Sequence, residues 1–401
     1  MAVVNNVEEH SGQALRAPLH GSREFGRSPR HPHALRREDL VRGLHLVQGV
    51  VERRNTLPIL SNVLVEPAEG GIALTATDME VGLRGLVPAQ MKKKGSVTLN
   101  ARKLYEIARE VTAEEVTLKS AQVGWVDLLA GRSKFRIVSL DPKDFPQLPL
   151  GTATVDGTSV RLAAGTLREM VDKTLFAVSS DETRFNLSGV FLSTPEAGTL
   201  RMVATDGHRL ALVDRRVPEV KLPRGVIMPR KGLLEARKLL DETGDEDVTV
   251  VVSSKDVRLA TPAVSFFMRL VEGEFPDYQQ VIPAAPRAQV RVNRDDLFAA
   301  LRRISLLASE RSRGVKFQLE RGRLELSASN PDQGEASEDV EITYAGDSLT
   351  LGFNARYVID VLAVHGEGEV IELGFTDEVG PALLRASGDP DYTYVVMPMR
   401  L

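Results

Sequence analysis

The sequence Val203-Ala204-Thr205-Asp206 has two variants elsewhere in the 401-residue chain, and this recurrence indicates how the chain is organised. They are Thr75-Ala76-Thr77-Asp78 and Ser327-Ala328-Ser329-Asn330. The last residues of successive copies lie 128 and 124 residues apart. Each copy follows a short apolar run, so we interpret it as a corner at the end of a strand. This spacing indicates three repeated units of about 125–130 residues.

Each unit also contains two predicted helices. Apolar residues recur at spacings of three and four in the first helix of each unit, which is the helical period. These apolar faces start near Leu40, Leu167 and Leu297, and the second helices start near Asn100, Pro229 and Asn354. Two helices and about eight short strands per unit predict an α+β fold made of three similar domains.

The predicted domain bounds follow the repeat and the Pro- and Gly-containing segments between the units. We expect a disordered extension at 1–35 and domains at 36–152, 153–284 and 285–401. The extension has no apolar period and holds four of the seven histidines. Its composition favours disorder. A loosely held metal at His31 and His33, or a basic arm that touches DNA, is the alternative.

The composition excludes several classes of protein. Because the chain has no cysteine, it cannot form disulfides, thiolate nucleophiles or cysteine-held metal sites. No apolar run approaches the ~18 residues of a membrane helix, and no apolar signal core is visible. We therefore expect a cytoplasmic protein. The formal net charge of −4 argues against a strongly basic protein that coats DNA.

The predicted helices are more basic than the rest of the chain. Counted over windows that include 36–54 for the first helix, they hold 18 Lys and Arg against 13 Asp and Glu. Solvated helix faces would explain this excess. The alternative is that six equivalent helices line one mildly positive surface, which would attract phosphates weakly and in a salt-dependent way.

Five motifs together resemble the bacterial sliding clamp family, the beta subunit of DNA polymerase III. They are Thr56-Leu57-Pro58-Ile59-Leu60-Ser61-Asn62, Ala204-Thr205-Asp206-Gly207-His208-Arg209-Leu210, Pro229-Arg230-Lys231-Gly232, Phe275-Pro276-Asp277-Tyr278 and Tyr394-Val395-Val396-Met397-Pro398-Met399-Arg400-Leu401. The resemblance covers residues 36–401. It implies a ring formed by a head-to-tail homodimer, with helices lining a channel for double-stranded DNA. The N-terminal extension is atypical of the family.

The resemblance also implies a function. The chain would be a non-catalytic processivity subunit that needs no cofactor or metal, and it would encircle DNA without reading its sequence. The implied protein partners are a second copy of the chain, the replicative polymerase catalytic subunit and the clamp loader. Translesion polymerases, mismatch-repair proteins and ligase would dock through short peptide motifs.

Three sets of site residues are carried over from the resemblance. The partner-peptide groove is implied at Leu187, Thr205, Gly207, His208, Arg209, Leu210, Pro276, Val281, Asn354, Tyr357, Val379, Pro381, Val395, Val396, Met397, Pro398, Met399, Arg400 and Leu401. DNA contacts are implied at Arg53, Arg54, Arg184, Arg230 and Lys231. The dimer interface is implied at Leu306 and Leu307, facing Phe135 and Ile137 of the other chain. Gln280 and Ser312 stand where some relatives carry Arg and an aromatic residue, so peptide preference is expected to differ there.

Each set also has a plainer interpretation. Asp206 and His208 look like part of an active site, but no nucleophile or second ligand pair accompanies them, so Gly207 is better explained by a tight turn. Residues 395–401 could be a core strand with a frayed end, and loop arginines are usually solvated. The competing functions are a hydrolase or transferase and an extracellular adhesion protein. The missing P-loop, HExxH and signal-peptide patterns disfavour both.

Overall fold

The computed structural model describes residues 35–51, 57–91, 93, 95–150, 157–181, 183–218, 220–283 and 286–400. Within them lie six α-helices and 24 β-strands. The elements repeat in one order three times, so each domain has eight strands and two helices. This confirms the predicted α+β fold of three similar domains. No helix in this part of the chain is long and apolar enough to span a membrane.

The element bounds follow the chain order. The first domain contains β1 (Leu35–Arg36), α1 (Arg37–Gln48), β2 (Asn62–Ala68), β3 (Gly71–Thr77), β4 (Val81–Pro88), β5 (Val97–Asn100), α2 (Ala101–Glu110), β6 (Glu115–Gln122), β7 (Trp125–Ala130) and β8 (Ser133–Val138). The second contains β9 (Thr158–Ala163), α3 (Ala164–Thr174), β10 (Gly189–Ser193), β11 (Thr199–Thr205), β12 (Arg209–Arg216), β13 (Val226–Pro229), α4 (Arg230–Thr243), β14 (Asp247–Val252), β15 (Asp256–Ala260) and β16 (Val264–Arg269). The third contains β17 (Ala288–Asn293), α5 (Arg294–Ile304), β18 (Gly314–Glu320), β19 (Arg323–Asn330), β20 (Gly334–Thr343), β21 (Leu349–Asn354), α6 (Ala355–Ala363), β22 (Val370–Phe375), β23 (Ala382–Ala386) and β24 (Asp389–Val396).

Local sequence explains where the helices form. In α1, Leu40, Leu44 and Val47 lie on one face and are completely buried, as their spacing predicts. Asn100 and Asn354 precede α2 and α6, and each side chain accepts a backbone N–H from the first turn of its helix. Such capping replaces a hydrogen bond that the helix cannot make itself, so these asparagines fix the starts that the sequence predicted.

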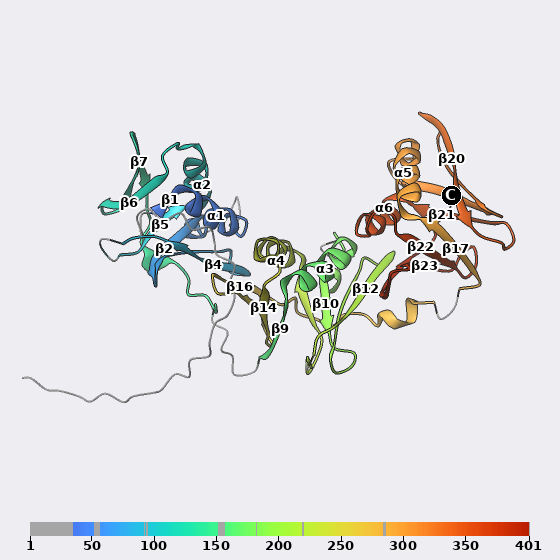
Figure 1. Cartoon of the computed structure of the whole chain (residues 1–401), viewed down its shortest axis with the longest axis horizontal. Coiled ribbons are helices and arrows are strands. Elements are labelled where there is room, and N and C mark those ends of the chain that lie inside the picture. Colours follow the sequence, from blue (N-terminus) through green and yellow to red (C-terminus); the bar gives the residue numbers. More distant parts are fainter. Residues whose placement is uncertain are drawn as a thin grey trace, which may run out of the picture.

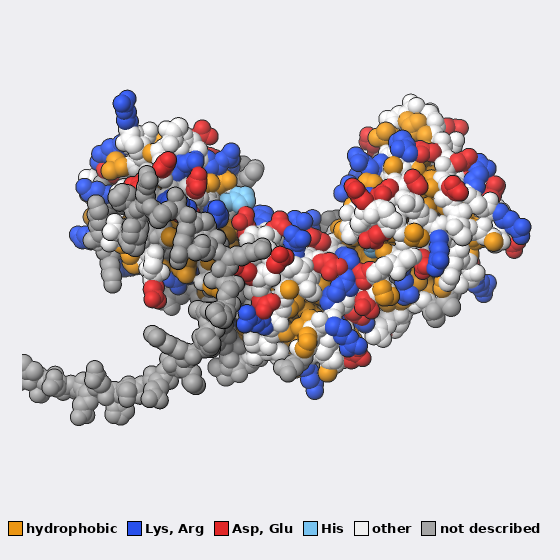
Figure 2. All heavy atoms as spheres, in the orientation of Figure 1, with side chains coloured by type: hydrophobic (Ala, Val, Ile, Leu, Met, Phe, Trp, Pro, Cys, Tyr) orange, Lys and Arg blue, Asp and Glu red, His pale blue; other side chains and the backbone are white. Residues whose placement is uncertain are grey.

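The domains form an arc. Helices from all three domains lie towards its concave side, and the strands form the convex side (Figure 1). The helix α1 ends at Gln48, and Arg53 and Arg54 lie outside the described residues. The six helices as folded hold 15 Lys and Arg against 12 Asp and Glu. The predicted positive sign is therefore retained, with a smaller excess. Acidic and basic side chains alternate closely on the surface (Figure 2).

Each domain contains two antiparallel four-stranded layers. In the first domain their orders are β1-β6-β7-β8 and β5-β2-β3-β4. The second domain repeats them as β9-β14-β15-β16 and β13-β10-β11-β12. The third repeats them as β17-β22-β23-β24 and β21-β18-β19-β20. In the first two domains the fourth and eighth strands end their layers, and β24 does so in the third. The last residues of β20 also pair with β17, Ile342 with Val292 and Thr343 with Arg291.

Two seams join the domains by continuing these layers. At the first seam β4 pairs antiparallel with β16, and Leu83 lies opposite Phe266. At the second seam β12 pairs antiparallel with β24, and Ala211 lies opposite Tyr394. Both seams thus join the fourth strand of one domain to the eighth strand of the next.

The repeated corner is held by one hydrogen-bond pattern. Thr77 Oγ1 donates to the carbonyl oxygen of Val81 at 2.8 Å, and Thr205 Oγ1 donates to that of Arg209 at 2.6 Å. The aspartate after each threonine accepts the backbone N–H of the first residue in the next strand. The Thr-Asp pair therefore recurs because it closes the turn that leads into a seam strand.

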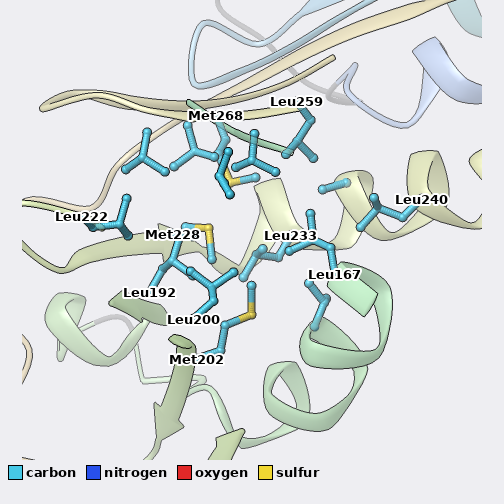
Figure 3. A pocket seen from close by; sticks show the side chains of 16 residues that line it. Leu167, Leu192, Leu200, Met202, Leu222, Met228, Leu233, Leu240, Leu259 and Met268 are labelled. Carbon is cyan, nitrogen blue, oxygen red and sulfur yellow. The ribbon is translucent and has the colours of Figure 1, made fainter. Parts of the chain in front are cut away.

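The core of the second domain retains a small cavity of about 20 Å³ (Figure 3). Met202, Met228 and Met268 contribute to its wall, and all the other lining side chains are apolar as well. An apolar void of this size offers no hydrogen-bond partner to a ligand or a water molecule. We interpret it as a packing defect between the helices and the sheets.

Candidate functional site

The residues of the predicted groove meet at the second seam. Leu210 and Val395 lie opposite each other in β12 and β24, and each is 2% exposed. They belong to a buried apolar cluster, which we call the groove floor, with Val203, Leu212 and Leu383. Val281 precedes Ile282, which packs against the floor, and Val379 and Met397 are four and two residues from the floor residues Leu383 and Val395. The side chains of Val281, Val379 and Met397 are 45%, 73% and 39% exposed. Exposed apolar side chains beside a buried apolar floor suit the apolar end of a peptide.

The C-terminal segment lies against this seam through its backbone. The N–H of Met397 donates to the carbonyl oxygen of His208 at 2.8 Å, and the N–H of Met399 donates to that of Gly352 at 2.8 Å. Pro398, which has no N–H, falls between these two donors and costs no hydrogen bond. Leu401 lies outside the described residues.

The first seam contains the same backbone path. There the N–H of Arg269 donates to the carbonyl oxygen of Glu80 at 2.8 Å, and that of Val271 donates to Ile227 at 2.9 Å. The C-terminal segment is therefore the counterpart of the chain that leaves β16, and it follows a path that the fold already uses.

Arg209 is a cation beneath this surface, and it links two domains. Its side chain is 9% exposed and pairs with Asp206 at 3.0 Å and with Asp360 of α6 at 2.8 Å. The guanidinium lies 4.4 Å from the centroid of the Tyr357 ring. Burial by itself would lower the pKa of Arg209, but the nearby Tyr394 and the two carboxylates raise it. Arg209 therefore stays charged and ties the groove floor to the third domain.

The other predicted groove residues have mixed roles. Leu187 is buried at the end of a short 3-10 helix, Phe185–Leu187. Gly207 has a φ of +90°, which agrees with the tight turn expected there. Val396 is buried opposite Arg209 in the seam. Pro276 and Pro381 precede the segments that contribute Val281 and β23, and Arg400 is exposed.

The predicted DNA residues are not gathered into one cluster. Lys231 of α4 pairs with Asp78, the corner residue of the first domain, so it also holds the first seam. Arg184 lies 3.6 Å from Asp181 and its side chain is 52% exposed. Arg230 is exposed at the start of α4. Arg53 and Arg54 lie outside the described residues.

The predicted dimer residues lie in the two terminal domains. Leu306 is 77% exposed, and the neighbouring Leu307 is half-buried. Phe135 and Ile137 are half-buried on β8, a strand that pairs with β7 alone among the described strands. Each set is thus placed where another chain could reach it.

Sequence reasoning missed Asp360, the partner of Arg209. A position-by-position comparison of the units could have found it, because the sixth residue of the second helix is acidic in every unit: Glu106, Glu235 and Asp360. It also missed a group of charged residues on α3, β12 and β24, which is described below.

Comparison with known proteins agrees with this architecture. Models of the N-terminal, central and C-terminal domains of the DNA polymerase III beta subunit match residues 33–149, 161–277 and 279–400. The beta sliding clamp of Pseudomonas aeruginosa is 39% identical over 92% of this chain and 99% of its own length. That of Escherichia coli K12 is 34% identical over 91% and 98%.

A solved structure shares the fold as well. The sliding clamp of Bartonella birtlesii bound to griselimycin matches with a TM-score of 0.86 at 37% identity, covering 92% of this chain and 99% of that one. The three domain models, the relatives and the shared fold together show that this chain belongs to the DNA polymerase III beta subunit family, the sliding clamps that confer processivity on a polymerase without being catalytic themselves.

Proposed function

We propose that two copies of this chain close head to tail into a ring around double-stranded DNA, with the helices lining the hole. The observation that carries the proposal is the pattern of the seams. Each seam joins a fourth strand to an eighth strand, and two such strands lie outside the seams: β8, and β20, whose residues 334–341 pair with β19 alone among the described strands. A contact between β20 of one copy and β8 of the next would repeat the internal seams, and two half-rings then close.

The internal seams also predict the register of this third contact. By its pairing within the domain, Ala336 of β20 corresponds to Ala211 of β12. Phe135 of β8 corresponds in the same way to Tyr394 of β24. Since Ala211 lies opposite Tyr394, we expect Ala336 opposite Phe135 of the second copy.

The charges on the two edges fit this register. On β8, the exposed Lys134 and Arg136 alternate with half-buried residues. On β20, the exposed Glu335, Asp339 and Glu341 alternate with half-buried or buried residues. One step from the Ala336–Phe135 pair, Arg136 would face Glu335. Opposite charges across a strand pair favour association and disfavour slipped registers.

Leu306 supports the same arrangement. It follows α5 at the position that Phe176 takes after α3, and the Phe176 ring packs 5.8 Å from the Tyr394 ring across the second seam. Because Phe135 replaces Tyr394 in the third contact, Leu306 would pack on Phe135 of the second copy. This would bury a leucine that is 77% exposed in the single chain.

The ring would serve as a mobile tether. A small excess of positive charge on the helices gives few close phosphate contacts, which suits sequence-independent binding that is weak and salt-sensitive. We infer that the groove at the second seam takes short peptide motifs of the replicative polymerase, the clamp loader, translesion polymerases, mismatch-repair proteins and ligase. Such partners would place the protein in the cytoplasm, beside the chromosome.

Light scattering tests the dimer directly. We expect the wild-type chain to have the mass of two copies and Leu306→Arg to have the mass of one, because the variant would bury an unpaired charge in the contact. Val123→Arg is the matched control, since Val123 is fully exposed on the turn between β6 and β7. A Leu306→Arg protein that folds normally and stays dimeric would contradict this contact.

The charge pair can be tested separately by exchanging its signs. Arg136→Glu alone should raise the dimer dissociation constant, because it places two carboxylates opposite each other. Adding Glu335→Arg should restore much of the lost affinity. The dimer affinity of the double variant should be higher than the two single substitutions predict when their effects are added. An affinity equal to that sum would indicate a different register.

A further inference from the structure

A cluster of four charged side chains crosses the second seam, and we call it the ionic clasp. It consists of Glu169 and Lys173 from α3, Arg215 from β12 and Asp389 from β24. Asp389 is the member that belongs to the third domain. The side chains of Lys173, Arg215 and Asp389 are only 10%, 17% and 19% exposed. The clasp lies at the end of the β12–β24 pair, away from Arg209.

The geometry of the clasp is directional. Arg215 holds Asp389 with two parallel hydrogen bonds, from Nη1 to Oδ1 at 3.2 Å and from Nη2 to Oδ2 at 2.7 Å. Lys173 also donates to Asp389. Glu169 accepts a hydrogen bond from Arg215 Nη2 at 2.6 Å and another from Lys173 at 2.7 Å, so each of the two cations is paired with two carboxylates. A two-point guanidinium–carboxylate contact fixes orientation as well as distance.

The strand that carries Asp389 is tied to α3 a second time. Tyr392 lies three residues further along β24 and is completely buried. Its hydroxyl donates to the carbonyl oxygen of Lys173 at 3.0 Å. The clasp is thus part of a built contact between α3 and β24, and not a pair of long side chains on the surface.

Two of the clasp positions are apolar among the described residues of the first seam. Arg215 is six residues after the start of β12, and the residue six after the start of β4 is Val87, which is 3% exposed. By its place in the helix, Lys173 corresponds to Leu46, which is 8% exposed. Apolar contacts are non-directional and tolerate sliding. A buried ion pair does not, because movement leaves a charge without its partner.

The second seam is therefore tied at both ends. Arg209 starts β12 and holds Asp360, and Arg215 holds Asp389 six residues later. Six residues of strand span about 20 Å. Two directional ties at that separation oppose rotation of one domain against the other, whereas a single tie would act as a pivot.

We propose that Asp389 is a positioning residue which, clasped by Arg215 and Lys173, fixes the angle between the second and third domains. That angle decides where Leu306 and the β20 edge are presented to a second copy. This consequence rests on the proposed ring, but the clasp itself does not. The clasp would let the chain keep the curvature of a half-ring before it meets its partner.

Distances between two spin labels on one chain test the clasp, and this measurement does not depend on whether the ring forms. The chain has no cysteine, so labels can be placed at will on exposed residues. Lys255 and Arg321 report on the second seam, and Val123 and Lys255 report on the first. Labelled chain would be diluted in excess unlabelled chain, so that each particle carries one labelled copy.

Asp389→Asn removes the charge and keeps the shape. We expect this variant to broaden the distance distribution across the second seam and to leave the distribution across the first seam unchanged. Glu196→Gln is the matched control, because it breaks the exposed pair with Arg216 inside the second domain, on the same strand as Arg215. Arg215→Lys keeps the charge but loses the fork, and it should broaden the distribution less.

The outcomes separate the clasp from the ring. An unchanged distribution across the second seam in both Asp389→Asn and Arg215→Lys overturns the inference. So does equal broadening at both seams. If the distribution broadens, the dimer dissociation constant of Asp389→Asn should rise, and an unchanged constant overturns the positioning role. A wild-type chain that proves monomeric would refute the ring. The label distances would still show whether the clasp restricts the angle between the second and third domains.

Discussion

At the scale of single residues, the corner turn has a backbone conformation that favours glycine. Gly207 has a φ of +90°, and Met79, at the same place in the first corner, has a φ of +81°. Left-handed backbone costs a residue with a Cβ roughly 1–2 kcal/mol. The first corner already bears this cost, and the second corner avoids it.

This difference gives a prediction for unfolding. Gly207→Ala should lower the free energy of unfolding by about 1 kcal/mol, partly offset by the lower entropy of the unfolded chain. Crowding adds little, because the new Cβ would meet only the flexible end of Arg184, at 3.0 Å. Met79→Ala is the control and should change stability much less. Urea denaturation measures both, and equal losses would contradict the account of the corner.

The sequence suggested site residues but not the neighbours that the fold gives them. Leu210 and Val395 were expected in the groove, and the structure brings them together in its floor. The DNA contact of Lys231 stays a prediction, and the structure adds its ion pair with Asp78. Nothing local could reveal that pairing, since Asp78 lies 153 residues away and belongs to another domain.

At the scale of elements, backbone hydrogen bonds from Met397 and Met399 join the C-terminal segment to the rest of the described fold. Among the described residues, removing Met397–Leu401 deletes these two hydrogen bonds and the exposed side chain of Met397, but β24 ends at Val396 and keeps its pairing. We expect this truncation to fold and dimerise normally and to lose measurable binding of a polymerase-derived peptide in calorimetry. Val123→Ser, far from the groove in the first domain, is a control that should bind as the wild type does. Peptide affinity retained by the truncated chain would move the docking site elsewhere.

The ionic clasp predicts how stability depends on pH. Hydrogen bonds from Arg215 lower the pKa of Glu169. Burial would raise the pKa of Asp389, but Arg215 and Lys173 outweigh it and lower that pKa. A carboxyl whose pKa is lower in the folded state adds stability above its unfolded pKa, near 4, and loses it as the pH falls.

Thermal melts between pH 7 and pH 3 would measure this effect. We expect the wild-type melting temperature to fall below about pH 4 as the two carboxylates become protonated. Asp389→Asn should melt lower at pH 7 and show a shallower fall in acid, because it has lost one of the two groups. If the melting temperatures of the two proteins fall in parallel as the pH is lowered, Asp389 does not contribute to the loss of stability in acid.

Element prediction succeeded where the pattern is local. Spacings of three and four found the first helices, and Asn100 and Asn354 marked the starts of two second helices. The window 36–54 used for the first helix is too long, since α1 ends at Gln48. The two-residue strand β1 was missed, because so short a segment shows no alternation and is defined by its pairing with β6.

At the scale of the whole molecule, the repeat predicted three domains but not their seams. Both seams pair residues 185 positions apart, Gly82 with Phe267 and Leu210 with Val395. No local pattern marks which edges will meet, since strand pairing depends on the folded surfaces of two domains. Once the two seams are known, their shared register predicts the third contact between copies.

Retention on circular DNA tests whether two copies of this chain form a closed ring. The protein is assembled on circular duplex DNA, the complex is separated from free protein in high salt, and half of it is then linearised with a restriction enzyme. A closed ring is held by topology and not by phosphate contacts, so it should remain on the intact circles and slide off the cut ones. Loss from both forms, or equal retention on both, would contradict the account.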